Sequence, residues 1–90
     1  MTILYANEAE CDKADKSIVD IERLARELSS LGRRARRLGV YVFGGSGTGT
    51  LRCHDGDGNL PPLILATIDG DFDGGDGTSG RDADGLDRGE

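Results

Sequence analysis

The chain has 90 residues, 31% of which are charged, and a formal net charge of −6. A chain this short allows one domain at most and buries only about 60% of its unfolded surface, so its core is marginal. No apolar run reaches the ~18–20 residues of a membrane-spanning helix, and the opening MTILYANEAE turns acidic too soon for a secretory signal. Cys11 and Cys53 are too few for a disulfide framework. We therefore expect a cytoplasmic protein with reduced thiols.

The charge is distributed unevenly along the chain. Residues 1–52 carry nine Lys and Arg against seven acids, whereas residues 53–90 carry two against ten. The acidic half disfavours direct DNA binding and favours a protein partner with a basic surface. The run RRARR, residues 33–37, is interpreted as the basic end of a helix, where the helix dipole favours cations.

The first elements expected along the chain are a short strand and a long helix. TILY, residues 2–5, is β-prone and would suit an edge strand. Residues 17–38 have apolar side chains at steps of three and four and are followed by Gly39, a helix-ending residue, while Glu22 and Arg26 are spaced for an ion pair on the polar side. The spacing of the apolar stripe predicts a core face or the seam of a homodimer. The stripe consists of Ile21, Leu24, Leu28, Leu31, Ala35 and Leu38.

Three β-prone segments follow the helix, at residues 40–43, 50–55 and 63–68. Glycine-rich and proline-containing turns separate them, and sequential hairpins favour neighbouring strands. The sequence therefore predicts an α+β fold, with one long amphipathic helix packed on a three-stranded antiparallel β-meander. We expect residues 1–73 to form this single domain and the Gly/Asp-rich residues 74–90 to be a flexible acidic tail.

Aspartates cluster after the last of these segments, in TIDGDFDGGDGTSG, residues 67–80. Asp69, Asp71 and Asp73 with the following glycine resemble the opening of an EF-hand calcium loop. The twelfth position of that loop is Gly80 instead of a glutamate, and a strand precedes it instead of a helix. A weak Ca²⁺-binding module remains an alternative, but we expect no metal site.

The alternation of side chains in the same segment predicts that the strand continues to residue 73. In that case Ile68 and Phe72 lie on one face and the aspartates on the other, wet face. A rigid acidic stripe of this kind suits a basic site on a partner protein. The partner-binding residues that we predict are Asp69, Asp71, Asp73 and Asp76.

A glycine-rich loop, GGSGTG at residues 44–49, connects two of the expected strands. Loops of this composition present backbone N–H groups that bind anions. The loop lacks the lysine of a phosphate-binding P-loop, and no helix follows it, so we interpret it as a hairpin connection. A small-ligand or nucleotide site remains the alternative. Its residues would be Gly44, Gly45, Ser46, Gly47, Thr48 and Arg52.

Residues that support catalysis are few in this sequence. Cys53 and His54 are adjacent on a strand and would point to opposite faces, which makes them a poor nucleophile and base. Two cysteines and one histidine also leave a zinc site short of its four ligands. We expect no catalytic residues and no cofactor.

These observations together indicate a small, acidic, non-enzymatic binding or inhibitor protein that engages a basic site on a partner protein. In size and charge the chain resembles phage-encoded inhibitors of host defence, such as the anti-CRISPR proteins. That resemblance implies a host-defence protein as the target. A nucleotide sponge that uses residues 44–49 and a Ca²⁺ module that uses residues 69–76 are the alternatives.

Overall fold

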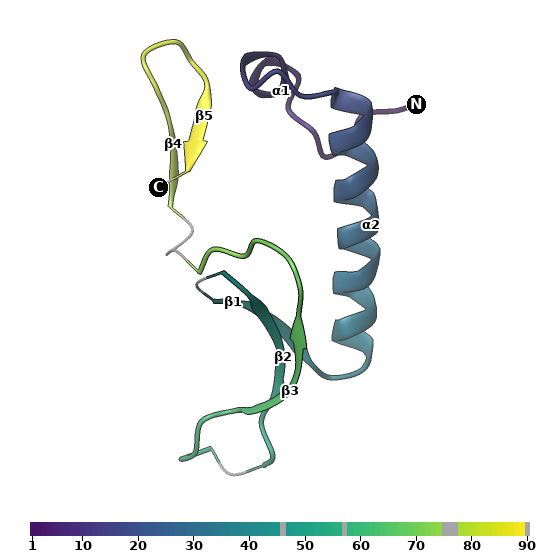
Figure 1. Cartoon of the computed structure of the whole chain (residues 1–90), viewed down its shortest axis with the longest axis vertical. Coiled ribbons are helices and arrows are strands. Elements are labelled where there is room, and N and C mark those ends of the chain that lie inside the picture. The colour runs from purple at the N-terminus through teal and green to yellow at the C-terminus, as the bar shows by residue number, and fades with distance from the viewer. Residues whose placement is uncertain (46, 57, 75–77, 90) are drawn as a thin grey trace. The chain divides into compact units, whose positions relative to one another are not determined.

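The computed structural model of the protein describes residues 1–45, 47–56, 58–74 and 78–89. In chain order its elements are α1 (Glu8–Lys13), α2 (Ile18–Arg37), β1 (Tyr41–Gly44), β2 (Gly49–Cys53), β3 (Leu63–Ile68), β4 (Ser79–Arg81) and β5 (Asp87–Gly89) (Figure 1). The predicted α+β class is confirmed, with one long helix and a three-stranded antiparallel sheet. The chain divides into two compact units, Met1–Leu31 with Gly77–Glu90 and Gly32–Asp76. The expected domain boundary at residue 73 stays a prediction.

The long helix α2 begins and ends where its sequence signals lie. The Ser17 hydroxyl oxygen accepts the backbone N–H of Asp20 at 3.3 Å, which caps the first turn. At the other end Gly39 has a φ of +74°, and the Val40 N–H donates to the Ala35 carbonyl at 3.0 Å. This left-handed glycine ends the helix and satisfies one of its last carbonyls.

The N-terminal residues differ from the sequence prediction. Residues 2–5 form no strand in the described structure, so the expected edge strand is wrong. The backbone N–H groups of this segment donate to a side chain of α2 instead of to a neighbouring strand. The short helix α1 follows and ends at Lys13. Asp15, with a φ of 57°, turns the chain between α1 and α2.

The sheet of the second unit has the strand order β1-β2-β3, with both pairs antiparallel. This is the predicted meander. A β-bulge lies between Leu51 and Arg52 on β2, where the register with β3 shifts from Ala66 to Ile64.

Regular structure also occurs within the segment that we expected to be a tail. Strands β4 and β5 pair as an antiparallel hairpin, and Asp82 organises the turn between them. One oxygen of its carboxylate accepts the N–H groups of Asp84 at 2.9 Å and Leu86 at 3.0 Å, and the other pairs with Arg88. Arg88, and then the N–H groups of Leu86 and Asp84, hold the pKa of Asp82 below its ordinary value although partial burial opposes them. Asp82 therefore holds the turn of this hairpin in place.

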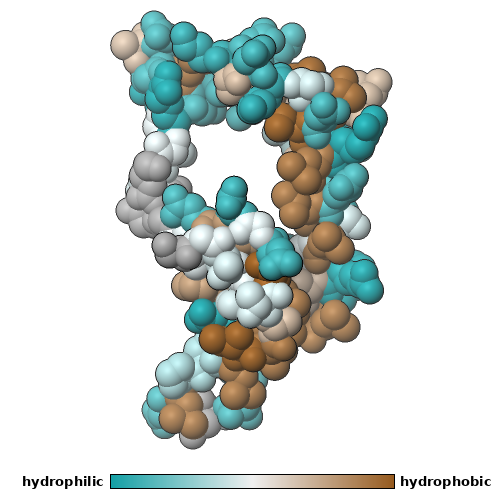
Figure 2. Space-filling view, in the orientation of Figure 1, coloured by the Kyte–Doolittle hydropathy of each residue, from teal (hydrophilic) through white to brown (hydrophobic). Residues whose placement is uncertain are grey.

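Large apolar side chains lie mostly on the surface of the single chain. Among the described residues Cys11 is the one hydrophobic residue that is buried, at 7% exposure. Figure 2 shows apolar residues along α2 and over the three-stranded sheet. Within the described residues, no helix is long and apolar enough to cross a membrane.

Candidate functional site

The register of the sheet places aliphatic side chains together on one of its faces. Val42 is opposite Leu51, which is opposite Ala66, and Cys53 is opposite Leu63. Paired residues share a face, and so does every second residue along a strand. The β-bulge adds one residue to β3 between Ala66 and Ile64, and this shift of the alternation puts Leu63 on the face of Ala66. Val42 is 47% exposed and Leu63 is 49% exposed, so this side of the unit presents apolar surface. Ile68 lies on the same side, two residues after Ala66. We call these six residues the sheet face: Val42, Leu51, Cys53, Leu63, Ala66 and Ile68.

One end of the sheet face is covered by Phe72. A Cβ added to Gly49 would lie 3.1 Å from the Phe72 ring, so the ring packs directly on this glycine. Gly70 has a φ of +138°, which turns the chain back over the sheet. A Cβ on Gly74 would overlap the Gly44 carbonyl oxygen. The glycines at both sides of this contact are therefore needed for close approach.

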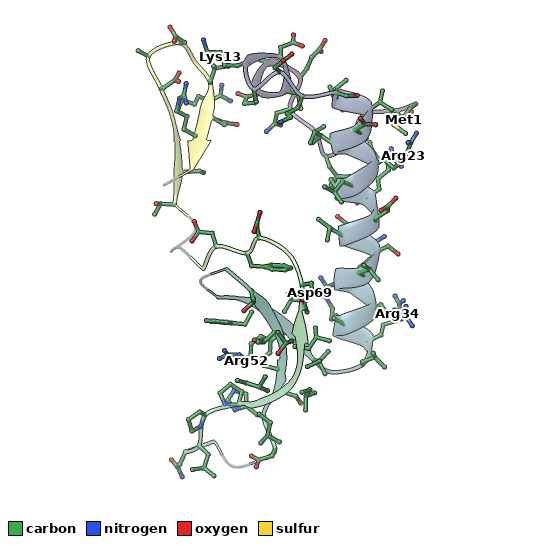
Figure 3. The ribbon with its side chains drawn as sticks, in the orientation of Figure 1. Met1, Lys13, Arg23, Arg34, Arg52 and Asp69 are labelled. Atoms are coloured by element: carbon green, nitrogen blue, oxygen red, sulfur yellow. The ribbon has the colours of Figure 1, made fainter. Side chains whose placement is uncertain are left out.

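The aspartates that follow β3 are not part of a strand, which corrects the predicted continuation to residue 73. The strand ends at Ile68 because the positive φ of Gly70 breaks the extended backbone. Asp69, Asp71 and Asp73 are exposed on the segment that follows, and Asp69 is labelled in Figure 3. Asp76 lies outside the described residues. Partner binding by these aspartates stays a prediction.

The glycine-rich loop connects the paired strands β1 and β2 of one hairpin, as we interpreted it. The Gly45 N–H donates to the Thr48 carbonyl, and the Gly47 N–H donates to the Phe72 carbonyl, both at 2.9 Å. Two of the N–H groups that would bind an anion are therefore used within the chain. Gly44 belongs to β1, and Ser46 lies outside the described residues. Ligand binding by this loop stays a prediction.

Arg52, the proposed anion partner, is engaged on the other side of the sheet (Figure 3). Its guanidinium carbon lies 4.0 Å from the centre of the Phe43 ring, and its Nε donates to the Thr50 hydroxyl at 2.8 Å. The cation–π contact and the hydrogen bond orient this arginine along β2.

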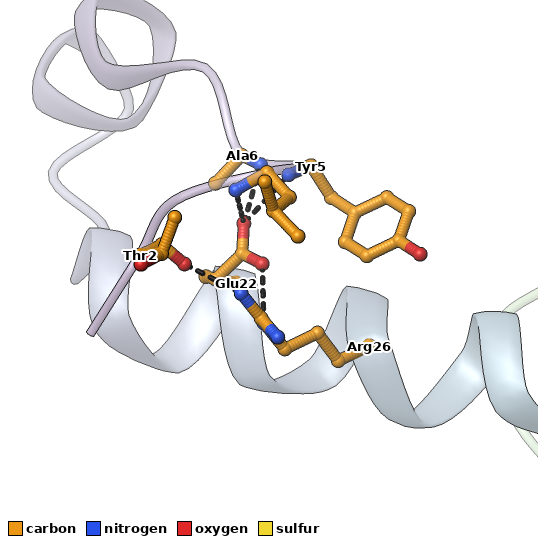
Figure 4. A network of polar contacts seen from close by, with 6 residues as sticks. Thr2, Tyr5, Ala6, Glu22 and Arg26 are labelled. Atoms are coloured by element: carbon orange, nitrogen blue, oxygen red, sulfur yellow. Dashed lines mark hydrogen bonds and ion pairs between the residues drawn. The ribbon is translucent and has the colours of Figure 1, made fainter.

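Glu22, which the sequence placed on the polar side of the helix, bonds to four residues (Figure 4). The side chain is fully buried. Its Oε1 accepts the backbone N–H groups of Leu4 at 3.0 Å, Tyr5 at 2.7 Å and Ala6 at 2.9 Å. Its Oε2 accepts the Nε of Arg26 at 2.6 Å. We call this set the Glu22 network.

The Glu22 network has a clear electrostatic signature. Burial raises the pKa of Glu22, but the N–H groups of Ala6 and Tyr5, then Arg26, and then the Leu4 N–H outweigh it and lower the pKa to about 2. Arg26 also donates to the Thr2 carbonyl at 2.6 Å. A carboxylate this acidic anchors the N-terminal segment and is a weak proton acceptor. The Glu22–Arg26 spacing was visible in the sequence, but nothing in it marks three backbone donors as partners.

A surface pocket of about 530 Å³ lies beside α1 and β5, within one unit. Glu10, Lys13, Asp87 and Arg88 give its lining mixed charge, and Glu10 accepts the Asp87 N–H at 2.8 Å. No buried polar side-chain atom of the described residues lacks a hydrogen-bond partner. The same part of the chain contains no group of three or more His, Cys, Asp or Glu side chains that could hold a metal ion.

Both cysteines are free thiols. Cys53 is half-buried on the sheet face, and its Sγ donates to the His54 carbonyl at 3.3 Å. No protein-family model, curated protein or solved structure matches the chain.

Proposed function

We propose that the protein is a non-enzymatic binding protein whose sheet face engages a partner protein with a basic surface. The observation that carries this proposal is the exposed sheet face beside exposed acidic residues. Val42 and Leu63 are each about half exposed, and Asp69 and Asp71 follow directly after β3. Aliphatic surface supplies affinity when water is excluded from it, and the aspartates supply orientation and a faster association.

The partner that fits this surface presents apolar side chains bordered by Lys and Arg. Proteins that hold nucleic acid have such basic surfaces, because their Lys and Arg contact phosphates. An inhibitor of a host-defence protein, the function implied by the size and charge of the chain, is the most specific form of this proposal. The two free thiols support a reducing, cytoplasmic location.

The test is an affinity capture with two variants of equal charge. The first variant combines Asp69→Asn, Asp71→Asn and Asp73→Asn. The control neutralises three exposed aspartates elsewhere, with Asp12→Asn, Asp15→Asn and Asp84→Asn. Proteins captured from a cell lysate by the wild-type chain are identified, and their association rates are then measured with purified components.

We expect the first variant to associate more slowly than the control at low salt, with the difference shrinking as salt is added. Equal binding by the first variant and the wild-type chain would contradict a role for these aspartates. A Val42→Ser variant that also binds normally would contradict the proposed role of the sheet face.

A further inference from the structure

We propose that α2 pairs in antiparallel orientation with α2 of a second copy of this chain. The apolar side of the helix is open in the single chain: Leu24 is 51% exposed, and Leu28 and Leu31 are each 56% exposed. The steps of three, four and three residues between these side chains and Ile21 are those of paired helices. We call the four large side chains the α2 front: Ile21, Leu24, Leu28 and Leu31.

The opposite side of the same helix is already occupied. At 3.6 residues per turn, Glu22 and Arg26 lie on the side of α2 away from the α2 front. The Glu22 network holds residues 2–6 there through the carboxylate and the guanidinium. The N-terminal segment therefore covers the back of the helix. Leu24, Leu28 and Leu31 of the α2 front stay exposed, while Ile21 is half-buried.

The charges of α2 identify the occupant as another copy of α2. The first half of the helix, residues 18–27, carries three acids and two arginines, and the second half, residues 28–37, carries four arginines and no acid. In a parallel pair the arginine-rich halves would lie side by side and repel. In an antiparallel pair each arginine-rich half lies beside the acidic half of the other helix. The two helix dipoles then run in opposite directions, which is also favourable.

One register combines this charge match with apolar contact. It places Ile21 against Leu31 of the second copy, and Leu24 against Leu28 of the second copy, so that symmetry gives four apolar layers. The same register brings Asp20 beside Arg34 of the second copy, twice in the dimer. Both residues lie on one flank of the α2 front, at heptad spacing with Glu27. Each Glu27 then meets its own counterpart near the twofold axis, which is the one unfavourable charge contact of this arrangement.

Dilution calorimetry of the full chain and three variants tests the proposal. Arg34→Glu replaces two attractions by two repulsions and should weaken the dimer about tenfold. Arg33→Glu makes the same change of charge on the back of the helix and should change the dissociation constant far less. Glu27→Gln should tighten the dimer, because it removes the repulsion at the twofold axis.

Circular dichroism of each variant at low concentration verifies that the helix is intact. Equal effects of Arg34→Glu and Arg33→Glu, or a weaker dimer for Glu27→Gln, would overturn the antiparallel register. A wild-type chain that stays monomeric at every concentration would overturn the pairing itself. The sheet-face proposal is independent of this result, since it uses no residue of α2.

Discussion

The two sides of α2 differ in how far the rest of the chain contacts them. On its back a fully buried carboxylate binds three consecutive backbone N–H groups and an arginine, all within one chain. On its front the leucines are more than half exposed. On α2 the chain therefore uses polar contacts to close on itself and leaves aliphatic side chains exposed.

The three-stranded sheet repeats this difference. Phe72 closes one end of the sheet face on Gly49, and the backbone of Asp73 and Gly74 approaches Gly44, where the absence of side chains allows direct contact. Elsewhere on the sheet face, Val42 and Leu63 are about half exposed. The contacts of the Glu22 network and of Phe72 thus depend on particular backbone geometry. The α2 front and the sheet face carry ordinary aliphatic residues, which are suited to an interface.

The largest expected effect is that of Glu22→Ala. This change leaves three backbone N–H groups and the Arg26 guanidinium without the acceptor that they share, so residues 2–6 should detach from α2. Hydrogen exchange at Leu4, Tyr5 and Ala6 should lose its protection. The control Glu27→Ala removes an exposed glutamate of the same helix and should leave that protection in place. Protected amides in the Glu22→Ala variant would show that the Glu22 network does not hold residues 2–6 on α2.

Acid should weaken the same attachment. The pKa of Glu22 is lowered from 4.5 to about 2 in the folded chain. Between these pH values the unfolded state binds a proton that the folded state does not, so stability falls as the pH decreases from 4.5 towards 2. Above pH 4.5 the contribution of Glu22 is fully present. Nuclear magnetic resonance of the Ala6 amide should report a transition near pH 2 that is missing in Glu22→Gln, and a transition unchanged by that substitution would refute the assignment.

A smaller effect is expected at the closed end of the sheet face. The Cβ of Gly49→Ala would press on the Phe72 ring, and overpacking of this kind costs about 1–3 kcal/mol of unfolding free energy. Gly58→Ala is the matched control, because its Cβ meets no atom within 4 Å. Urea denaturation should show the loss for Gly49→Ala and a change within about 0.5 kcal/mol for Gly58→Ala. Equal stabilities would mean that Phe72 does not pack on this strand.

The smallest effect on the isolated chain is expected for Leu28→Ala. In dilute protein this substitution should lower the free energy of unfolding by less than about 0.5 kcal/mol, because the Leu28 side chain is 56% exposed and alanine is a good helix former. At high protein concentration, where the helices are paired, the same substitution should lower the free energy of unfolding by about 1–2 kcal/mol per chain, because it removes buried apolar area from the pair. Urea midpoints at the two concentrations measure the difference, and a large loss in dilute protein would show that Leu28 is a core residue of the single chain.

Elements with local signals were predictable from the sequence. The cap at Ser17, the left-handed Gly39 and the β-prone segments placed α2 and the meander correctly. The exact end of β3 was not predictable, because Gly70 could either continue the alternation or turn the chain, and its contact with Phe72 decides between them.

Contacts between residues far apart in the sequence could not be predicted from its patterns. The partners of Glu22 are backbone groups, which have no sequence signature, and the segment that carries them resembles an edge strand. Asp82 and the hairpin β4–β5 were hidden for a related reason, since the composition of residues 74–90 is typical of a flexible tail. For the candidate site, composition indicated acidic residues after β3, but the sheet register was needed to show which aliphatic residues share a face.

The mass of the protein in solution decides whether a second copy of the chain covers the α2 front. Sedimentation equilibrium of the wild-type protein should show an average mass that rises from 9.5 kDa towards twice that value as the concentration increases through the micromolar range. Leu24→Asp, which places a charge in the middle of the pair, should hold the mass at 9.5 kDa. A wild-type mass that stays at 9.5 kDa over the whole range would show that α2 does not pair with a second copy.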